Sequence, residues 1–296
     1  MMVQDRTFAS RLFDGFNLVF LLLVGASCLL PIVHLAAVSL SDASAVGGGL
    51  VSLVPIRPTL ASYEMLLEDD AFFRAVGVSV MRTAVGTVVN MLMVILLAYP
   101  MAQSPRKLKY RNPLMAFIII TMYFSAGLIP TYMVVRAVGL LNSFWALILP
   151  TAVPVWSVVI LMNFFRSQPR ALEEAGLIDG ASPMQILIRI SLPIARPALA
   201  TLTLFALLRH WNSWFDGLIY LNRPRQYPLQ TYLYGQIVNQ DLAQLLQQGA
   251  ENLIFFFSQE TLRAAQLFLA TIPIIVVYPF LQRHFVKGIV IGSVKE

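Results

Sequence analysis

The sequence predicts an all-α integral membrane protein with about six transmembrane helices, and two observations support this fold class. Hydrophobic residues make up 58% of the chain and charged residues only 12%, whereas a soluble domain carries about 25% charged residues. The charged residues are also clustered, so that long apolar runs separate them. A soluble core of this size would not bury so much apolar surface, and we therefore expect lipid to cover it.

Five stretches contain no Asp, Glu, Lys or Arg, and each is long enough for the roughly 20 residues that cross a bilayer. They are residues 15–41, 83–105, 112–135, 137–165 and 264–282. A sixth apolar run, at about 197–221, carries only Arg209 and Asp216 as charges. We expect a single membrane domain over residues 1–296, with helices at roughly 15–40, 75–103, 113–135, 142–165, 197–221 and 262–283.

The first apolar run also resembles a cleaved signal peptide in one respect, because Arg6 and Arg11 precede it. However, no charged residue interrupts residues 15–41. The apolar core of a signal peptide is only about 7–15 residues long and ends at a small-residue cleavage site. We expect this run to be an uncleaved first membrane helix.

The net charge of +6 does not indicate a nucleic-acid partner, because the basic residues form no stripe or patch. They gather at the ends of the apolar runs, where basic residues mark the cytoplasmic side of a membrane protein. With the N-terminus inside, thirteen Lys and Arg residues fall on the inner side and six on the outer side, and the basic segment 104–112 contributes most to this difference. We expect both termini to be cytoplasmic.

Residues 167–197 form a polar segment that this orientation places in the cytoplasm. Pro169 is suited to the first turn of one short helix, and Ser182 is suited to the N-cap of a second. Between them, Asp179 and Gly180 form a turn pair, since glycine adopts backbone angles that other residues resist. The sequence thus predicts a cytoplasmic loop made of two short helices.

The second helix of this loop is predicted to be amphipathic, with Ile186, Leu187 and Ile190 on one face. Such an apolar stripe is typical of a helix that lies on lipid headgroups. It also occurs on a helix that fits a groove on a partner protein. Periodicity alone favours the location on the lipid headgroups.

The first helix contains Glu174-Ala175-Gly176, then Gly180, and the second ends in Ile190-Ser191-Leu192-Pro193. This pattern resembles the EAA signature of ABC importer permeases, E-A-A-x-x-x-G followed at a fixed distance by I-x-L-P. Gly176 departs from the second alanine, and Leu187 stands where an aromatic residue is common. In that family the loop is a coupling helix that docks in a cleft of the ATPase subunit. The resemblance implies an ATPase contact made by Glu173, Glu174, Ala175, Gly176, Asp179, Gly180, Ala181, Ile190, Leu192 and Pro193.

Four further segments are similar to the carbohydrate-uptake branch of this family, which includes the maltose-type permeases. They are residues 58–63, 210–216, 227–230 and 282–295. Within the branch, the chain resembles most a subgroup that imports complex polysaccharides and oligosaccharides, including alginate and other uronic-acid fragments. The resemblance implies a permease of the bacterial inner membrane. Its implied partners are a second homologous permease chain, two ATPase subunits and an extracytoplasmic solute-binding protein.

The sequence contains no catalytic or nucleotide-binding motif. It has no G-x-x-x-x-G-K-[S/T] phosphate-binding loop, and its three histidines and single cysteine are not spaced as metal ligands. We therefore expect this chain to bind no cofactor, and ATP and Mg²⁺ to be used by the partner ATPase subunits. The alternatives are a permease of the same superfamily for a non-sugar solute, a membrane-embedded enzyme and a stand-alone ion channel.

Arg209 and Asp216 lie inside an apolar run, where a charge costs about 2.5–3.5 kcal/mol and so normally faces a cavity or a partner. Seven residues apart on one helix, they would share a face. Aromatic, amide and charged groups together suit a sugar. The expected substrate path consists of Arg209, Trp211, Asn212, Trp214 and Asp216. The alternative places both tryptophans in the interfacial aromatic belt and Asp216 near the outer surface.

Arg82 is expected to extend outward to the membrane surface.

Overall fold

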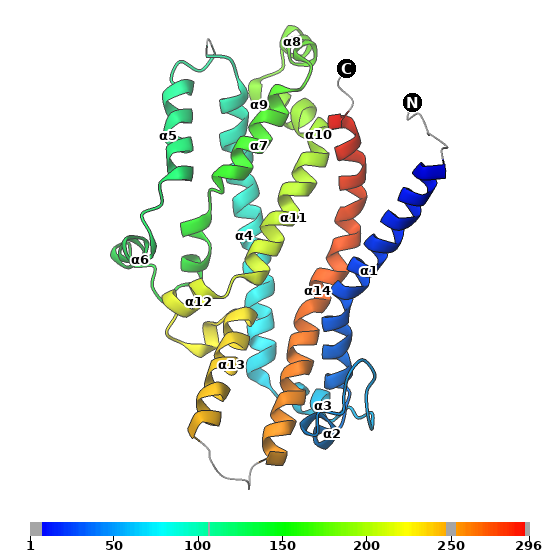
Figure 1. Ribbon diagram of the computed structural model, residues 1–296. Coiled ribbons are helices and arrows are strands. Elements are labelled where there is room, and N and C mark those ends of the chain that lie inside the picture. Colours follow the sequence, from blue (N-terminus) through cyan, green and yellow to red (C-terminus); the bar gives the residue numbers. More distant parts are fainter. Residues whose placement is uncertain (1–7, 106, 247–252, 294–296) are drawn as a thin grey trace. The chain divides into compact units, whose positions relative to one another are not determined.

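The computed structural model describes residues 8–105, 107–246 and 253–293 (Figure 1). All regular structure in these residues is helical, and they contain no strand, so the predicted all-α membrane fold is confirmed. The longer helices are α1 (Phe8–Ser39), α4 (Asp70–Ala102), α5 (Arg111–Tyr123), α6 (Leu128–Ala137), α7 (Val155–Arg166), α8 (Arg170–Ile178), α11 (Arg196–Asn212), α13 (Leu229–Leu246) and α14 (Leu253–Ser293). The short elements are α2 (Ala43–Gly47), α3 (Ala61–Leu67), η1 (Phe144–Leu147), η2 (Leu149–Thr151), α9 (Pro183–Ile186), η3 (Leu187–Ser191), α10 (Leu192–Ile194), α12 (Phe215–Tyr220) and η4 (Pro224–Gln226).

Between three and six membrane spans fit the described helices, in agreement with the predicted number of about six. Three helices contain an apolar segment long enough to cross a bilayer, at Ser10–Ser39, Asp70–Ala102 and Ser258–Val277. Three bent helix pairs add one span each if both halves cross together. These pairs are Arg111–Tyr123 with Leu128–Ala137, Phe144–Thr151 with Val155–Arg166, and Pro183–Ile194 with Arg196–Asn212, bent by 118°, 49° and 82°.

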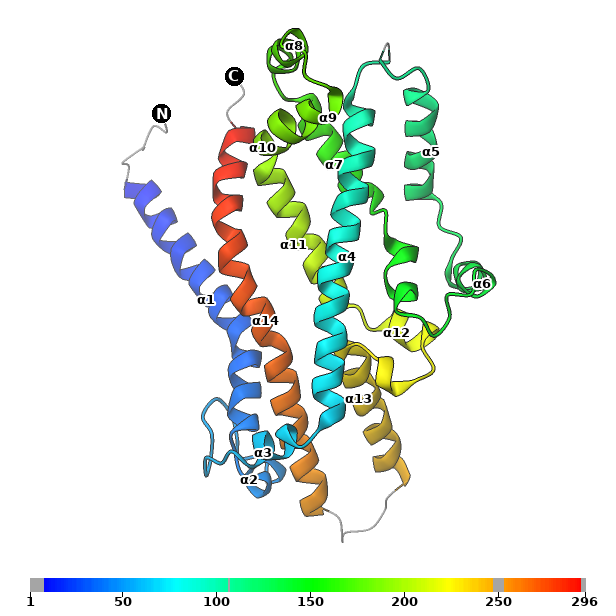
Figure 2. The same cartoon turned by 180° about the vertical axis from the view of Figure 1, so that it is seen from behind.

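The run predicted as one helix at 113–135 differs from this expectation, because it is broken between α5 and α6 (Figure 2). Phe124 has an extended backbone with φ −106° and ψ 107°, and Gly127 has φ +85°, a value that favours glycine. Pro130 follows in the first turn of α6, where its missing N–H leaves no hydrogen bond unmade. Local backbone chemistry therefore interrupts a segment that hydropathy alone marks as continuous.

The runs at 142–165 and 197–221 are broken as well. The first begins with the two 3₁₀ turns η1 and η2, and Pro150 and Pro154 lie before α7, where each removes a backbone donor. The second is interrupted after Asn212, because Ser213 has an extended backbone with φ −77° and ψ 125°. The expectation that Arg209 and Asp216 share one helix face is therefore wrong, since they lie on two separate helices, α11 and α12.

The chain divides into two compact units, Met1–Asp70 with Asp241–Ile272 and Ala71–Gln240 with Pro273–Glu296. In the first unit, the end of α1 packs on the segment that follows it: the hydroxyls of Ser39 and Tyr63 lie 2.8 Å apart. Asp42 caps α2, and its hydrogen bond from Ser44 holds the pKa of that carboxyl below its usual value. The single permease domain expected over 1–296 stays a prediction.

The second unit is built around α4, α7 and α11 (Figures 1 and 2). Its buried apolar core includes Val94 and Ala98 of α4, Val158 and Leu161 of α7, and Leu202 of α11. Because α7 ends at Arg166 and α11 begins at Arg196, the loop 167–197 connects two of the three core helices directly. Figure 1 shows α8 of this loop beyond the same ends of α4, α5 and α7.

Candidate functional site

The first helix of the loop, α8, ends in a Schellman motif. Ala181 donates its backbone N–H to the carbonyl of Gly176 at 2.9 Å, and Gly180 donates to that of Leu177 at 3.1 Å. Gly180 has φ +78°, the left-handed conformation that this motif requires. The predicted turn at Asp179 and Gly180 is confirmed, and the glycine of the signature sits where a side chain would strain the backbone.

The second part of the loop begins with a capping box. The Ser182 hydroxyl accepts the backbone N–H of Gln185 at 3.3 Å, and the Gln185 side chain accepts the N–H of Ser182 at 2.8 Å. Pro183 follows at the first helical position. The helix then widens into the π turn η3, whose last bond runs from the N–H of Leu192 to the carbonyl of Leu187. The two predicted helices of the loop are thus present.

The apolar stripe of the second helix is used within the loop itself. Ile186 and Leu187 are buried and Ile190 is partly buried. A Cβ atom at Gly176 would lie 3.0 Å from Cδ1 of Ile190 and 3.4 Å from Cγ1 of Ile186. Glycine therefore replaces the signature's alanine where these isoleucines pack tightly on α8. In this structure the stripe therefore lies against other residues of the same chain.

The side of α8 that faces away from Ile186 and Ile190 forms the exposed surface of the loop. Glu174, Ala175 and Asp179 are exposed, and Ile178 is 86% exposed. The predicted ATPase-contact residues therefore fall into two groups. Glu174, Ala175, Asp179 and Gly180 are exposed, whereas Glu173, Gly176, Ala181, Ile190, Leu192 and Pro193 are partly or fully buried.

Two polar contacts join the loop to α4 and to the segment that follows it, and a third joins the two ends of the loop to each other. Lys107 Nζ lies 2.8 Å from Oε1 of Glu173 in an ion pair, and Gln168 donates to the carbonyl of Ser191 at 3.0 Å. The hydroxyl of Tyr99 on α4 donates to the carbonyl of Pro183 at 3.4 Å. Sequence reasoning missed these contacts, although the basic segment 104–112 was an available signal for the lysine.

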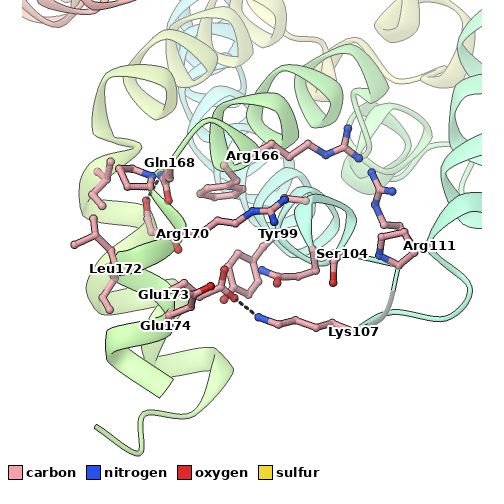
Figure 3. A pocket seen from close by; sticks show the side chains of 18 residues that line it. Tyr99, Ser104, Lys107, Arg111, Arg166, Gln168, Arg170, Leu172, Glu173 and Glu174 are labelled. Carbon is pink, nitrogen blue, oxygen red and sulfur yellow. Dashed lines mark hydrogen bonds and ion pairs between the residues drawn. The ribbon is translucent and has the colours of Figure 1, made fainter. Parts of the chain in front are cut away.

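A polar cavity of about 410 Å³ lies behind α8 (Figure 3). Figure 3 shows Glu173 and Glu174 on one side of it and Arg111 and Arg166 on the other. Both arginines donate to the carbonyl of Met101, at 2.8 and 3.2 Å. This carbonyl belongs to the last turn of α4, where helix carbonyls lack intrahelical partners and attract cations. The end of α4, the start of α5 and the end of α7 are therefore tied at one backbone oxygen.

A buried ion pair lies in the second unit, away from the loop. Arg82 on α4 is 2% exposed and forms a bidentate pair with Asp216, with Nη1 3.1 Å from Oδ1 and Nη2 bonded to Oδ2. Arg82 Nη1 also donates to the carbonyl of Ser213 at 3.1 Å, at the break between α11 and α12. The expectation that Arg82 extends outward is wrong, because a buried charge needs a partner and Asp216 supplies one.

The predicted substrate-path residues differ in their exposure and in their contacts. Arg209 and Asn212 are exposed, whereas Trp211 is buried. The ring of Trp214 stacks on Tyr234, with centroids 4.1 Å apart. Of these residues on α11, Arg209 and Asn212 therefore have side chains on the exposed surface of the helix.

His210 is fixed next to Arg209. Its Nε2 lies 2.7 Å from Oδ1 of Asn90, and its ring packs on Gly86, where a Cβ atom would lie only 2.5 Å from Cε1. Asn90 donates to the carbonyls of Thr151 and Ala152 at 2.9 and 2.8 Å. Sequence reasoning missed this network, since no local pattern marks Asn90.

Residues 94–291 match the family model described as "Binding-protein-dependent transport system inner membrane component". The chain belongs to this family. The permease is 39% identical to Protein LplC of Bacillus subtilis (strain 168), covering 99% of this chain and 98% of that protein. It is also 39% identical to the polygalacturonan/rhamnogalacturonan transport system permease protein YtcP of the same organism, covering 97% and 99%.

Among solved structures, the permease is similar to a chain of a bacterial ABC transporter involved in the import of the acidic polysaccharide alginate. The TM-score is 0.84 and the identity 30%, with 94% of this chain and 98% of that chain covered. The resemblance to ABC importer permeases is therefore confirmed. The family is described as an inner membrane transport component and YtcP is named as a permease, so the chain is an inner-membrane transport subunit and not an enzyme.

Proposed function

We propose that this permease imports an acidic oligosaccharide across the bacterial inner membrane by alternating access, driven by ATP hydrolysis in partner subunits. The observation that carries the proposal is similarity along the full length to two permeases of acidic sugars. One is named for polygalacturonan and rhamnogalacturonan at 39% identity, and the other belongs to an importer of alginate at 30%. These sugars are rich in uronic acids, so a permease for either of them has to accommodate carboxylate groups.

The proposed assembly contains a second homologous permease chain, two ATPase subunits and an extracytoplasmic solute-binding protein. The family description itself refers to a binding protein. ATP and Mg²⁺ bind to the ATPase subunits, because this chain has no phosphate-binding loop. Both termini and the loop 167–197 lie in the cytoplasm, as the distribution of basic residues predicts.

The ATPase contact is proposed to form on the exposed side of α8. Ile178 offers an apolar anchor there, with Glu174 and Asp179 on the same exposed surface. The buried residues of the motif then have a different role, because Gly176 and Ile190 hold the two parts of the loop together and let the loop move as one body. Tyr99 and Lys107 connect that body to α4 and its following segment.

Co-purification tests the assembly. The permease would be isolated from native membranes with its bound chains, then reconstituted in vesicles with the binding protein. We expect two ATPase subunits per complex, and uptake of uronate oligosaccharides accompanied by binding-protein-stimulated ATP hydrolysis. A complex that lacks ATPase subunits, or that transports an amino acid or phosphate in place of any sugar, would refute the proposal.

A further inference from the structure

A small cavity of about 190 Å³ lies where α4, α7 and α11 meet. Asn90 of α4, Trp156 and Ser157 of α7, and Phe205 and Arg209 of α11 contribute to its wall. Its volume is below the roughly 300–1,000 Å³ of pockets that enclose a drug-sized ligand. The cavity therefore suits a single ring of a longer chain.

Two aromatic rings stand at this cavity, one from each of two helices. The rings of Trp156 and Phe205 have centroids 5.7 Å apart and an interplanar angle of 56°. Trp156 is 50% exposed and Phe205 is 41% exposed, so part of each ring remains uncovered. Aromatic surface of this kind packs against the apolar face of a sugar ring.

Arg209 supplies a positive charge at the same place. It lies four residues after Phe205, so both project from the same side of α11. Within the described residues Arg209 is in ion-pair contact with no carboxylate, and Asp216, whose charge acts on it from a distance, is already paired with Arg82. A guanidinium without a direct partner in a membrane segment is costly unless it meets an anion or water. Its planar fork matches a carboxylate.

Asn90 and Ser157 add polar groups to the lining of the cavity. Asn90 is held by three hydrogen bonds, to His210, Thr151 and Ala152. Because His210 directly follows Arg209 in the chain, this network fixes α11 at the point where the Arg209 side chain leaves it. Ser157 adds a hydroxyl to the wall.

We propose that this cavity is a subsite for one uronate residue of the transported chain. Trp156 and Phe205 pack on the sugar ring, and Arg209 binds its carboxylate. The inference rests on the proposed function and deepens it. Trp156, Ser157 and Phe205 belong to no sequence motif. Trp156 and Ser157 lie on α7, a helix that the expected substrate path did not include.

The test uses the complete transporter in vesicles and two substrates, a uronate oligosaccharide and its carboxyl-reduced neutral counterpart. Arg209→Lys should raise the KM for the acidic sugar about tenfold and leave that for the neutral sugar unchanged, because lysine keeps the charge but loses the fork. Trp156→Ala and Phe205→Ala should raise the KM for both sugars about tenfold. Trp156→Phe should retain most of the uptake.

Matched controls come from the same unit. Trp145→Ala removes a tryptophan that is 46% exposed but lines none of the cavities described above, and Arg136→Lys alters an exposed arginine at the end of α6. Both should leave the KM for each sugar unchanged. Co-purification of the partner subunits establishes that each variant assembles.

The outcomes separate the two proposals. If the wild-type transporter imports no oligosaccharide, the proposed function fails and the subsite fails with it. If the wild type imports uronate chains but the Trp156, Phe205 and Arg209 variants behave like the controls, only the subsite is refuted. If Arg209→Lys weakens uptake of both sugars equally, carboxylate recognition by Arg209 is refuted. Anionic lipid retained by the wild type and lost from Arg209→Ala, with uptake unchanged, would assign the cavity to lipid.

Discussion

The loop 167–197 and the membrane segment 196–220 adjoin in sequence, yet they are held together in different ways. Within the loop, the capping box joins residues three positions apart, and the Schellman motif joins residues five positions apart. The membrane segment is held by residues distant in sequence. Asp216 pairs with Arg82, 134 residues away, and His210 contacts Asn90, 120 residues away. Local chemistry therefore sets the turns of the loop, whereas long-range pairing holds the membrane segment.

The largest expected effect comes from breaking the buried ion pair. Arg82→Met should destabilise the protein by about 3–5 kcal/mol, because it leaves the Asp216 carboxylate without its partner. The measurement is the thermal unfolding midpoint of the purified transporter, together with the yield of assembled complex.

The matched control is the double variant Arg82→Met with Asp216→Leu. Replacing both charges with apolar side chains is often neutral, so the double variant should recover most of the stability. A double variant as unstable as Arg82→Met would mean that the unfilled hydrogen bonds of Ser213 and Leu147 dominate, and not the unpaired charge.

A smaller effect is expected at the turn of the loop. Gly180→Val places a β-branched residue at φ +78°, which costs about 1–2 kcal/mol. The change should distort the end of α8, so uptake and stimulated ATPase activity should fall while membrane insertion persists. Gly180→Asn is the control, because asparagine tolerates this conformation. Equal activity of the valine and asparagine variants would contradict the role of the left-handed turn.

A still smaller effect is expected where the loop's two parts pack. Gly176→Ala gains helix propensity of about 1 kcal/mol but places a methyl group 3.0 Å from the end of Ile190. The two effects oppose each other, so the stability should change by less than about 1 kcal/mol. In a protein that already carries Ile190→Val, Gly176→Ala should raise the unfolding midpoint relative to Ile190→Val alone. A Gly176→Ala variant that loses several degrees even with Ile190→Val would show that another neighbour limits the site.

The smallest effect is expected for the ion pair between Lys107 and Glu173, which is partly exposed to solvent. A double-mutant cycle with Lys107→Ala and Glu173→Ala should give a coupling energy of about 0–1 kcal/mol that decreases with added salt. A coupling that persists at high salt would indicate that the pair is shielded within the assembly.

The same contrast explains what could be predicted from the sequence. The turn at Gly180 and the cap at Ser182 follow from residue types within a few positions, so the two-helix fold of the loop was predicted correctly. Hydropathy indicated where the apolar runs lie but not that three of them are broken, because Gly127, Pro154 and Ser213 interrupt helices without adding charge.

The candidate site was predicted only in part for a related reason. Arg209 was identified because a charge in an apolar run is visible in the sequence. Trp156 and Phe205 were not, since they meet only when α7 packs against α11. Arg82 was recognised as a charge, but its partner is 134 residues away, and no local pattern indicates the pairing.

Helix α4 also has mechanical properties that follow from its contacts. It is held at Arg82 by the ion pair and at Tyr99 by its contacts with Pro183 and Phe165. The intervening segment contains no proline and is about 25 Å long at 1.5 Å per residue. Such a segment behaves as a stiff lever, for which a tilt of about 5° about the Arg82 end displaces the Tyr99 end by about 2 Å. A displacement of the loop by about 2 Å would therefore tilt α4 at the Arg82 end, where this side chain contacts the break between α11 and α12.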